Sequence, residues 1–256
     1  MFPPELVAFS HHLADLARAE TMPRFAARVG AENKVAAGYD PVTEADREAE
    51  RVMRAAIEAE HPDHGVAGEE FGARAGTSRW SWSLDPIDGT RAFICGLPSW
   101  TTLIALLDAG APVAGIIDAP VLGERAVGVG DRAWVNAVAA RTSGCGALGK
   151  ARLSTTDPSL FPPAEAEGWN RVRRAVRVTR YGLDAYAYLR LAAGDVDLVV
   201  ESGLHAHDWQ ALVPVVEGAG GFVCDWEGGR ELGPGRIVAA ASEGLAMEAV
   251  DLLRPA

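Results

Sequence analysis

Residues 80–93 read WSWSLDPIDGTRAF and combine a strand pattern with a pair of carboxylates. The segment from Trp80 to Leu84 alternates large apolar and small polar residues, which predicts a strand. Asp85 and Asp88 follow at a spacing of i and i+3, so both carboxylates should leave the end of that strand together. Pro86 would stiffen the turn, and Gly89 would allow close approach of the backbone, so that the amides after it could bind an anion at a helix start.

Only oxygen ligands are available in this motif, and such a set suits Mg²⁺ or Mn²⁺. A lone Asp-x-x-Asp is more often a turn that caps a helix, so the interpretation depends on the rest of the chain. Glu69 and Glu70 follow the short apolar segment Val66-Ala67, and Asp208 opens a predicted helix. Taken alone, the first pair reads as a solvated turn and Asp208 as a helix N-cap. Together, the three acidic clusters could converge at one edge of the fold.

The first half of the chain is predicted to pack helices on a mostly antiparallel sheet. Apolar residues recur at helical spacing from Glu5 to Glu20, and Thr43 and Asp46 have the form of a capping box that starts a second helix. Gly128 and Gly130 are interpreted as marking a turn or bulge. The predicted strands of this half lie at residues 80–84, 101–107, 113–117, 125–129 and 133–135.

In the second half, strands and helices alternate, which predicts a layered α/β arrangement. The basic run from Arg171 to Arg180 alternates with valines, so we interpret it as an exposed strand face rather than a nucleic-acid surface. We therefore expect residues 1–142 to carry the metal motifs and residues 143–256 to complete the metal and substrate site. Strands are predicted at 153–155, 174–178, 196–200, 221–224 and 237–241, and helices at 183–193, 208–217 and 243–253.

Composition and charge narrow the class of protein. The 256 residues are 48% hydrophobic and 23% charged, as in an ordinary globular protein. A net charge of -11 opposes binding to nucleic acid, and it favours bound cations if the substrate is an anion. The three cysteines are far apart and suggest neither disulfides nor a zinc site. The start of the chain lacks a signal-peptide pattern, and no apolar run reaches the roughly 18 residues of a membrane span, so we expect a cytoplasmic protein without a membrane partner.

The acidic motifs resemble the signatures of the inositol monophosphatase family. Gly68-Glu69-Glu70, the segment from Asp85 to Thr90, and Asp208 before the glycine-rich 218–221 stand in the family's order and spacing. With Asp46 included, the similarity covers nearly the whole chain. It implies an α/β fold of alternating α/β/α/β/α layers, a homodimer, and a magnesium-dependent phosphomonoesterase that lithium inhibits. The substrate would be a small-molecule phosphate monoester, and the site would hold two or three Mg²⁺ ions, with Mn²⁺ as an alternative.

Carried over by motif, the resemblance also implies a role for each site residue. The first metal would be held by Glu69, Asp85 and the main-chain carbonyl of Ile87. The second would be held by Asp85, Asp88 and Asp208. A third, weaker metal would depend on Glu69, largely through water. Asp46 and Thr90 would orient the attacking water, and Gly89 and Thr90 would adjoin the phosphate. Glu70 is left outside the ligand set.

Finer similarity favours the histidinol-phosphatase branch of the family. It lies in residues 82–98, 153–156, 181–188 and 211–221. The preferred reaction is hydrolysis of L-histidinol phosphate to histidinol and phosphate, in histidine biosynthesis. Two alternatives stay open: a broad phosphatase for inositol or sugar phosphates, and a non-catalytic relative, which should have lost a ligand or Thr90. His207 replaces the branch's usual aromatic residue, and Asp131-Arg132 interrupts a usual small-residue turn, so both could mark altered selectivity.

Glu201 is the main candidate for a contact with the leaving group. It follows the apolar strand 196–200 and stands seven residues before Asp208, so it should lie at the same edge as the metals. Its carboxylate could accept hydrogen bonds from the cationic amine or imidazole of histidinol, assisted by Asp184 and His205. The alternative is a solvated loop carboxylate.

Overall fold

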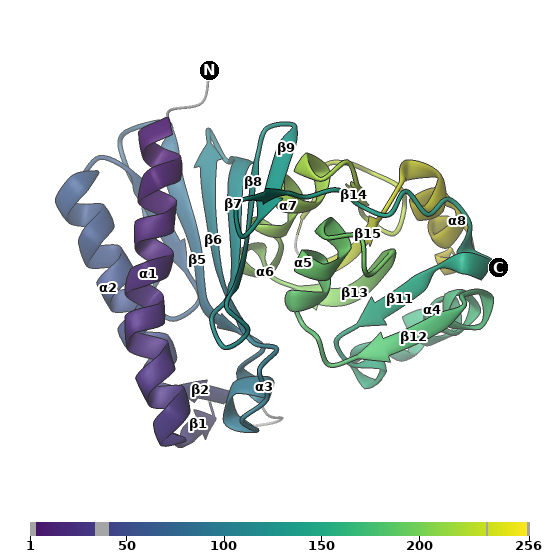
Figure 1. Cartoon of the computed structure of the whole chain (residues 1–256), viewed down its shortest axis with the longest axis horizontal. Helices are drawn as coiled ribbons and strands as arrows, with labels where there is room; N and C mark the ends of the chain where they lie inside the picture. The colour runs from purple at the N-terminus through teal and green to yellow at the C-terminus, as the bar shows by residue number, and fades with distance from the viewer. Residues whose placement is uncertain (1–3, 34–40, 234, 255–256) are drawn as a thin grey trace.

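Helices and sheets alternate in layers across the molecule (Figure 1). The computed structural model describes residues 4–33, 41–233 and 235–254, so the first three residues, on which the signal-peptide prediction partly rests, lie outside the described residues. Two outer helices cover one face of an eight-stranded sheet, further helices fill the space between this sheet and a five-stranded one, and two helices cover the far side. This order confirms the predicted layered α/β sandwich.

The first layer consists of α1 (Pro4–Ala27) and α2 (Glu44–Glu60). The predicted capping box is present: Thr43 Oγ1 accepts from the amide of Ala45 at 3.0 Å, and Asp46 Oδ2 accepts from the amide of Thr43 at 2.8 Å. Below this start, Ala49, Met53 and Ile57 are buried against α1 and the sheet, as the apolar stripe requires. A capped helix with one buried face therefore fixes the direction of Asp46.

The large sheet has the strand order β10-β9-β8-β7-β6-β5-β3-β4. All its described pairs are antiparallel except β3 with β5, which confirms the predicted meander. Its strands are β3 (Gly65–Gly68), β4 (Gly72–Arg74), β5 (Trp80–Asp88), β6 (Thr101–Asp108), β7 (Ala111–Ala119), β8 (Glu124–Val129), β9 (Arg132–Val135) and β10 (Val138–Ala139). The strand predicted to end at Leu84 continues to Asp88, with an irregular pairing to β6 between Asp85 and Asp88 that re-aims the two carboxylates.

The middle layer holds α5 (Tyr186–Ala192), α6 (Ala206–Trp209) and α7 (Leu212–Gly218). The helix predicted over 208–217 is thus wrong as one element, because this segment is divided between α6 and α7.

The prediction for Gly128 is also wrong, because this glycine lies within β8 and only Gly130 stands at the turn, with φ +58°. A Cβ on Gly128 would lie 2.1 Å from the carbonyl oxygen of Pro214, so Gly128 allows α7 to approach the sheet closely.

The second sheet has the order β12-β11-β13-β15-β14 and combines parallel and antiparallel pairs. Its strands are β11 (Arg152–Thr155), β12 (Val178–Tyr181), β13 (Leu198–Leu204), β14 (Phe222–Cys224) and β15 (Gly235–Ala240), and α4 (Pro163–Ala175) and α8 (Glu243–Leu253) cover its outer face. The strand predicted over 174–178 is wrong. Arg174 and Ala175 end α4, whose residues Trp169 and Val172 are buried three apart on one helical face, and β12 begins only at Val178.

Five short elements complete the described part of the chain: the strands β1 (Ala31–Asn33) and β2 (Pro41–Thr43), which form a two-stranded ribbon, the helix α3 (Thr90–Ile94), and two 3₁₀ turns, Leu148–Lys150 and Pro158–Leu160. None of the described helices is long and apolar enough to cross a membrane. The strands of the large sheet end at Ala139 and those of the second sheet begin at Arg152, but the proposed division of the chain near residue 142 stays a prediction.

Candidate active site

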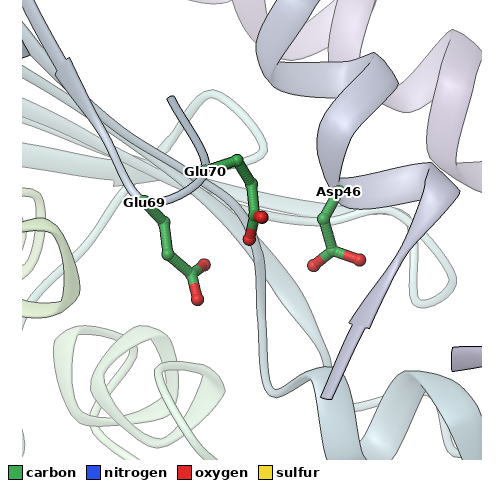
Figure 2. A group of neighbouring side chains, drawn as sticks. All are labelled: Asp46, Glu69 and Glu70. Carbon is green, nitrogen blue, oxygen red and sulfur yellow. The ribbon is translucent and has the colours of Figure 1, made fainter. Parts of the chain in front are cut away.

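One group of carboxylates forms where α2 begins beside the turn between β3 and β4. Figure 2 shows Asp46 on the first turn of α2 and Glu69 and Glu70 on the facing turn, with their carboxylates directed toward a shared space. One oxygen from each lies within 4.8 Å of the others. Glu70, which the sequence prediction left outside the ligand set, is therefore part of this group.

A second group consists of Asp85, Asp88 and Asp208, again with one oxygen from each within 4.8 Å of the others. Asp85 Oδ1 accepts from the amide of Ile87 at 3.1 Å, and Asp88 Oδ2 accepts from the amide of Ala185 at 2.7 Å. Asp208 lies in the first turn of α6, where Oδ2 accepts from the amide of His205 at 2.6 Å. Each carboxylate is thus fixed by a backbone amide, and the structure brings together the residues predicted for the second metal.

Burial and mutual repulsion raise the pKa values of carboxyl groups in both groups. Burial raises the pKa of Asp46 to about 7, and the charges of Glu69 and Glu70 add to the rise against two hydrogen bonds from Thr43. The pKa of Asp85 is raised well above its ordinary value by burial and then by the charge of Glu69. The pKa values of Asp88 and Asp208 are also raised, in both cases first by burial. A bound divalent cation would relieve this repulsion.

The donors present fit a hard divalent cation. Both groups offer carboxylate oxygens, the ligands that Mg²⁺ and Mn²⁺ prefer, and neither contains a histidine or cysteine among the described residues. Asp46 Oδ1 is buried and accepts no hydrogen bond from the described residues, although its partner oxygen is held by Thr43. Because a buried carboxylate oxygen without a partner is costly, it is expected to contact a cation or a metal-bound water.

The segment after Asp88 turns the chain into α3. Gly89 has φ +82°, a left-handed conformation that favours glycine, and α3 begins at Thr90. Thr90 Oγ1 donates to the carbonyl oxygen of Ile87 at 3.1 Å. The hydroxyl proposed to orient water and the carbonyl proposed as a metal ligand are therefore in direct contact.

Both carboxylate groups border a cavity of about 540 Å³. Its lining includes Glu69, Asp88, Gly89, Thr90 and Asp208, whereas Asp46, Glu70 and Asp85 are not among the lining residues. The remaining lining residues are Arg91, Thr156, Leu160, Asp184, Ser202, Gly203, Leu204, His205 and His207. Gly89 and Thr90, which were predicted to adjoin the phosphate, thus line the same cavity as carboxylates of both groups.

Two of the three predicted leaving-group contacts, Asp184 and His205, line this cavity. Glu201 does not, and it borders a recess of about 20 Å³ that has Asp88, Asp184 and Asp208 among its own lining residues. Its carboxylate accepts from the amide of Thr156 at 2.7 Å, from Thr156 Oγ1 at 3.0 Å and from Thr155 Oγ1 at 3.1 Å. Burial raises the pKa of Glu201 to about 8 against these bonds.

Residues that sequence reasoning left without a site role also surround the cavity. Leu160, whose side chain is well exposed, comes from the 3₁₀ turn that begins at Pro158, and no local signal distinguishes it from other loop residues.

His207, one of the two departures from the family pattern, lines the cavity. Its Nε2 lies 3.3 Å from Asp208 Oδ1, and its ring is stacked on that of His205 with centroids 5.5 Å apart. Asp131, the other departure from the family, is almost fully exposed in the turn between β8 and β9.

Comparisons with known proteins agree with this geometry. The sequence profile of the "Inositol monophosphatase family" matches residues 4–254. The histidinol-phosphatase of Streptomyces coelicolor is 36% identical over 250 residues, covering 92% of this chain and 91% of that protein. The "Bifunctional phosphatase IMPL2, chloroplastic" of Arabidopsis thaliana is 49% identical over 195 residues, covering 75% of this chain but only 56% of that protein's length.

Among solved structures, an inositol monophosphatase from Zymomonas mobilis matches with a TM-score of 0.87 and 42% identity, covering 98% of both chains. A profile match over almost the whole chain, relatives above 30% identity and this structural similarity agree with one another. The chain therefore belongs to the inositol monophosphatase family and is a metal-dependent phosphomonoesterase.

Proposed function

We propose that the protein hydrolyses L-histidinol phosphate to L-histidinol and phosphate, with two or three Mg²⁺ ions at the two carboxylate groups. The observation that carries the substrate proposal is a carboxylate outside both groups, that of Asp184, which lines both the cavity and the recess. Burial raises the pKa of Asp184 to about 6, partly offset by the charge of Arg91. A negative charge at this place suits a cationic leaving group.

The place of Asp184 in the cavity suits a contact with the amine of this substrate. Its Oδ2 lies 3.1 Å from where a Cβ on Gly89 would stand, so the carboxylate adjoins the proposed phosphate end of the cavity. In histidinol phosphate the ammonium group is carried by the carbon next to the ester CH₂, close to the phosphate. Glu201 lines the same recess, and an ammonium group there would favour its charged form.

The reaction assigns different tasks to the residues of the site. When bound, divalent cations polarise the phosphoryl oxygens, lower the pKa of a coordinated water and neutralise the leaving alkoxide. Thr90 Oγ1 donates a hydrogen bond to the carbonyl oxygen of Ile87. The lone pairs of the Thr90 hydroxyl would therefore be free to accept a hydrogen bond from the attacking water. Asp46, with one oxygen fixed by Thr43, would use the other to orient the same water. Asp184 would hold the leaving group in place.

An inositol or sugar phosphatase is the second candidate. Its support is the 42% identity with the inositol monophosphatase from Zymomonas mobilis, and it would use the same carboxylate groups. The two candidates differ at the leaving group, since inositol offers only neutral hydroxyls to Asp184. Relative kcat/KM values therefore separate them.

The test compares the parent enzyme with Asp184→Asn on three substrates under saturating Mg²⁺. A hydrogen bond to a charged group contributes about 1.5–3 kcal/mol, so the variant should lose about ten- to a hundredfold in kcat/KM for histidinol phosphate. The kcat/KM for p-nitrophenyl phosphate, which has no cation to bind, should change less than about threefold on the same reasoning. A parent enzyme that prefers inositol 1-phosphate, or an equal loss on all substrates, would contradict the proposal.

A further inference from the structure

The turn that carries Glu69 and Glu70 is held by a carboxylate that belongs to neither group, that of Glu50 on α2. Glu50 Oε2 accepts from the amide of Glu70 at 2.7 Å, and Oε1 accepts from the amide of Phe71 at 3.2 Å. The Glu50 side chain has no exposed surface. A fully buried carboxylate thus binds two of the three amides in the turn between β3 and β4.

The third amide of the turn is bound from the opposite side. The amide of Glu69 donates to the carbonyl oxygen of Leu84 on β5 at 3.2 Å. The two elements that hold the turn also carry other carboxylates of the site: Leu84 directly precedes Asp85, and Glu50 follows Asp46 by one helical turn on α2. These amide bonds therefore tie Glu69 and Glu70 to the backbones that carry Asp46 and Asp85.

An arginine side chain and a closely packed glycine surround the Glu50 carboxylate. Arg54 Nε donates to Glu50 Oε1 at 2.6 Å, and the Arg54 guanidinium also donates to the carbonyl oxygen of Gly72, at the far end of the same turn. A Cβ on Gly68 would lie 2.2 Å from Glu50 Oε1, so the carboxylate occupies the space that any other residue at position 68 would fill. Packing and charge both fix Glu50 against the turn.

We propose that Glu50 is a positioning residue for the metal site, which holds Glu69 and Glu70 in the orientation that cations require. Both oxygens of Glu50 are already occupied by the two amides and Arg54, so Glu50 acts through the turn and not as a ligand. The inference rests on the proposed role of Glu69 in metal binding. Residues that hold metal ligands in place through hydrogen bonds typically contribute ten- to a hundredfold to metal affinity, because they restrict the orientation of the ligands.

The test measures Mn²⁺ binding to the metal-free enzyme by electron paramagnetic resonance, a readout that does not depend on turnover. Glu50→Gln keeps the shape of the side chain, but its single amide oxygen cannot accept hydrogen bonds from both amides and the guanidinium as a carboxylate does. Gly68→Ala displaces Glu50 without changing its charge. Glu58→Gln, an exposed glutamate on the same helix, is the matched control. We expect Mn²⁺ affinity to fall about tenfold or more in the first two variants and to stay unchanged in the control.

Activity adds a second readout that separates positioning from general destabilisation. The Mg²⁺ concentration for half-maximal activity should rise with Glu50→Gln, while kcat at saturating Mg²⁺ should recover most of the parent value. Parent-like Mn²⁺ affinity in both Glu50→Gln and Gly68→Ala, or a lower melting temperature without any change in metal affinity, would overturn the role of Glu50. A parent enzyme that binds no Mn²⁺ would instead contradict the proposed function.

Discussion

The two carboxylate oxygens of Asp46 have different roles, one structural and one proposed to be chemical. Its Oδ2 closes the capping box by accepting from both the amide and the hydroxyl of Thr43, while its buried Oδ1 has no hydrogen-bond partner among the described residues, and the carboxylate lies close to those of Glu69 and Glu70. A capping box is a local pattern, so the sequence was sufficient to predict the start of α2 and the direction of this carboxylate. The convergence with Glu70 depends on the fold and had no local signal.

Asp88 and Thr90 are expected to fail for different reasons when substituted. Asp88→Asn removes a charge from the second carboxylate group, so it should weaken Mg²⁺ binding and reduce kcat together. Thr90→Ala removes only the hydroxyl next to Ile87, so it should leave metal affinity unchanged and reduce kcat by about a hundredfold. Isothermal titration with Mg²⁺, combined with steady-state kinetics, separates the two effects.

Asp131→Asn is the control for that comparison, since it removes an equal charge from an almost fully exposed side chain outside both groups. It should match the parent enzyme in both measurements. Parent-like metal binding and turnover in Asp88→Asn would show that the second group is not a metal site.

At the scale of single elements, close packing of α7 on the large sheet depends on glycine. Gly128 lies in β8 beneath Pro214, and Gly115 in β7 lies in the same way beneath Ala211. The Leu212 and Val215 side chains of α7 fill the adjoining core. Because α6 and α7 follow each other directly, the packing of α7 also fixes the start of α6, where Asp208 stands.

Gly128→Ala should therefore destabilise the protein and disturb the site at a distance. The added Cβ would meet a backbone oxygen, which cannot rotate away, so we expect a loss of about 1–3 kcal/mol in the free energy of unfolding. Urea unfolding measures this loss directly. Gly244→Ala is the matched control, because no atom lies within 4 Å of its Cβ position in α8, and it should be neutral or slightly stabilising. Equal stability of the two variants would contradict the packing argument.

The elements were predictable where one face is buried and periodic, and less so elsewhere. In the large sheet, β5 to β9 were predicted from their alternating or apolar patterns, and α8 from its helical pattern, whereas the short strands β3, β4 and β10 were not predicted. The strand predicted over 174–178 began too early, because the alternating arginines and valines run on from the end of α4 at Ala175 into β12 at Val178. The residues that decide for a helix, Trp169 and Val172, lie earlier in α4. Pro163 in the first turn of α4 was the available signal for a helix start.

For the whole molecule, the site depends on segments that are far apart in the chain. Its carboxylates come from α2, from the turn between β3 and β4, from β5 and from α6. The motifs predicted this set because each lies at the end of an element. The leaving-group end could not be predicted equally well. Glu201 was expected at the cavity wall, but hydrogen bonds from Thr155 and Thr156 hold its carboxylate at the small recess, and these contacts depend on the pairing of the second sheet. The proposed contact between Glu201 and substrate stays a prediction.

The central claim is that the carboxylate groups act through bound divalent cations. The most direct measurement is phosphate release from histidinol phosphate by enzyme that a chelator has freed of metal, as Mg²⁺ is then restored. Activity should be absent in excess chelator and return with Mg²⁺, and Li⁺ should inhibit it. The half-saturating Mg²⁺ concentration should be lower at pH 8 than at pH 6, because burial raises the pKa of Asp46 to about 7 and also raises the pKa of Asp85, Asp88 and Asp208. Below these pKa values a cation must displace protons, and above them it need not. Full turnover in excess chelator, at either pH, would contradict the account.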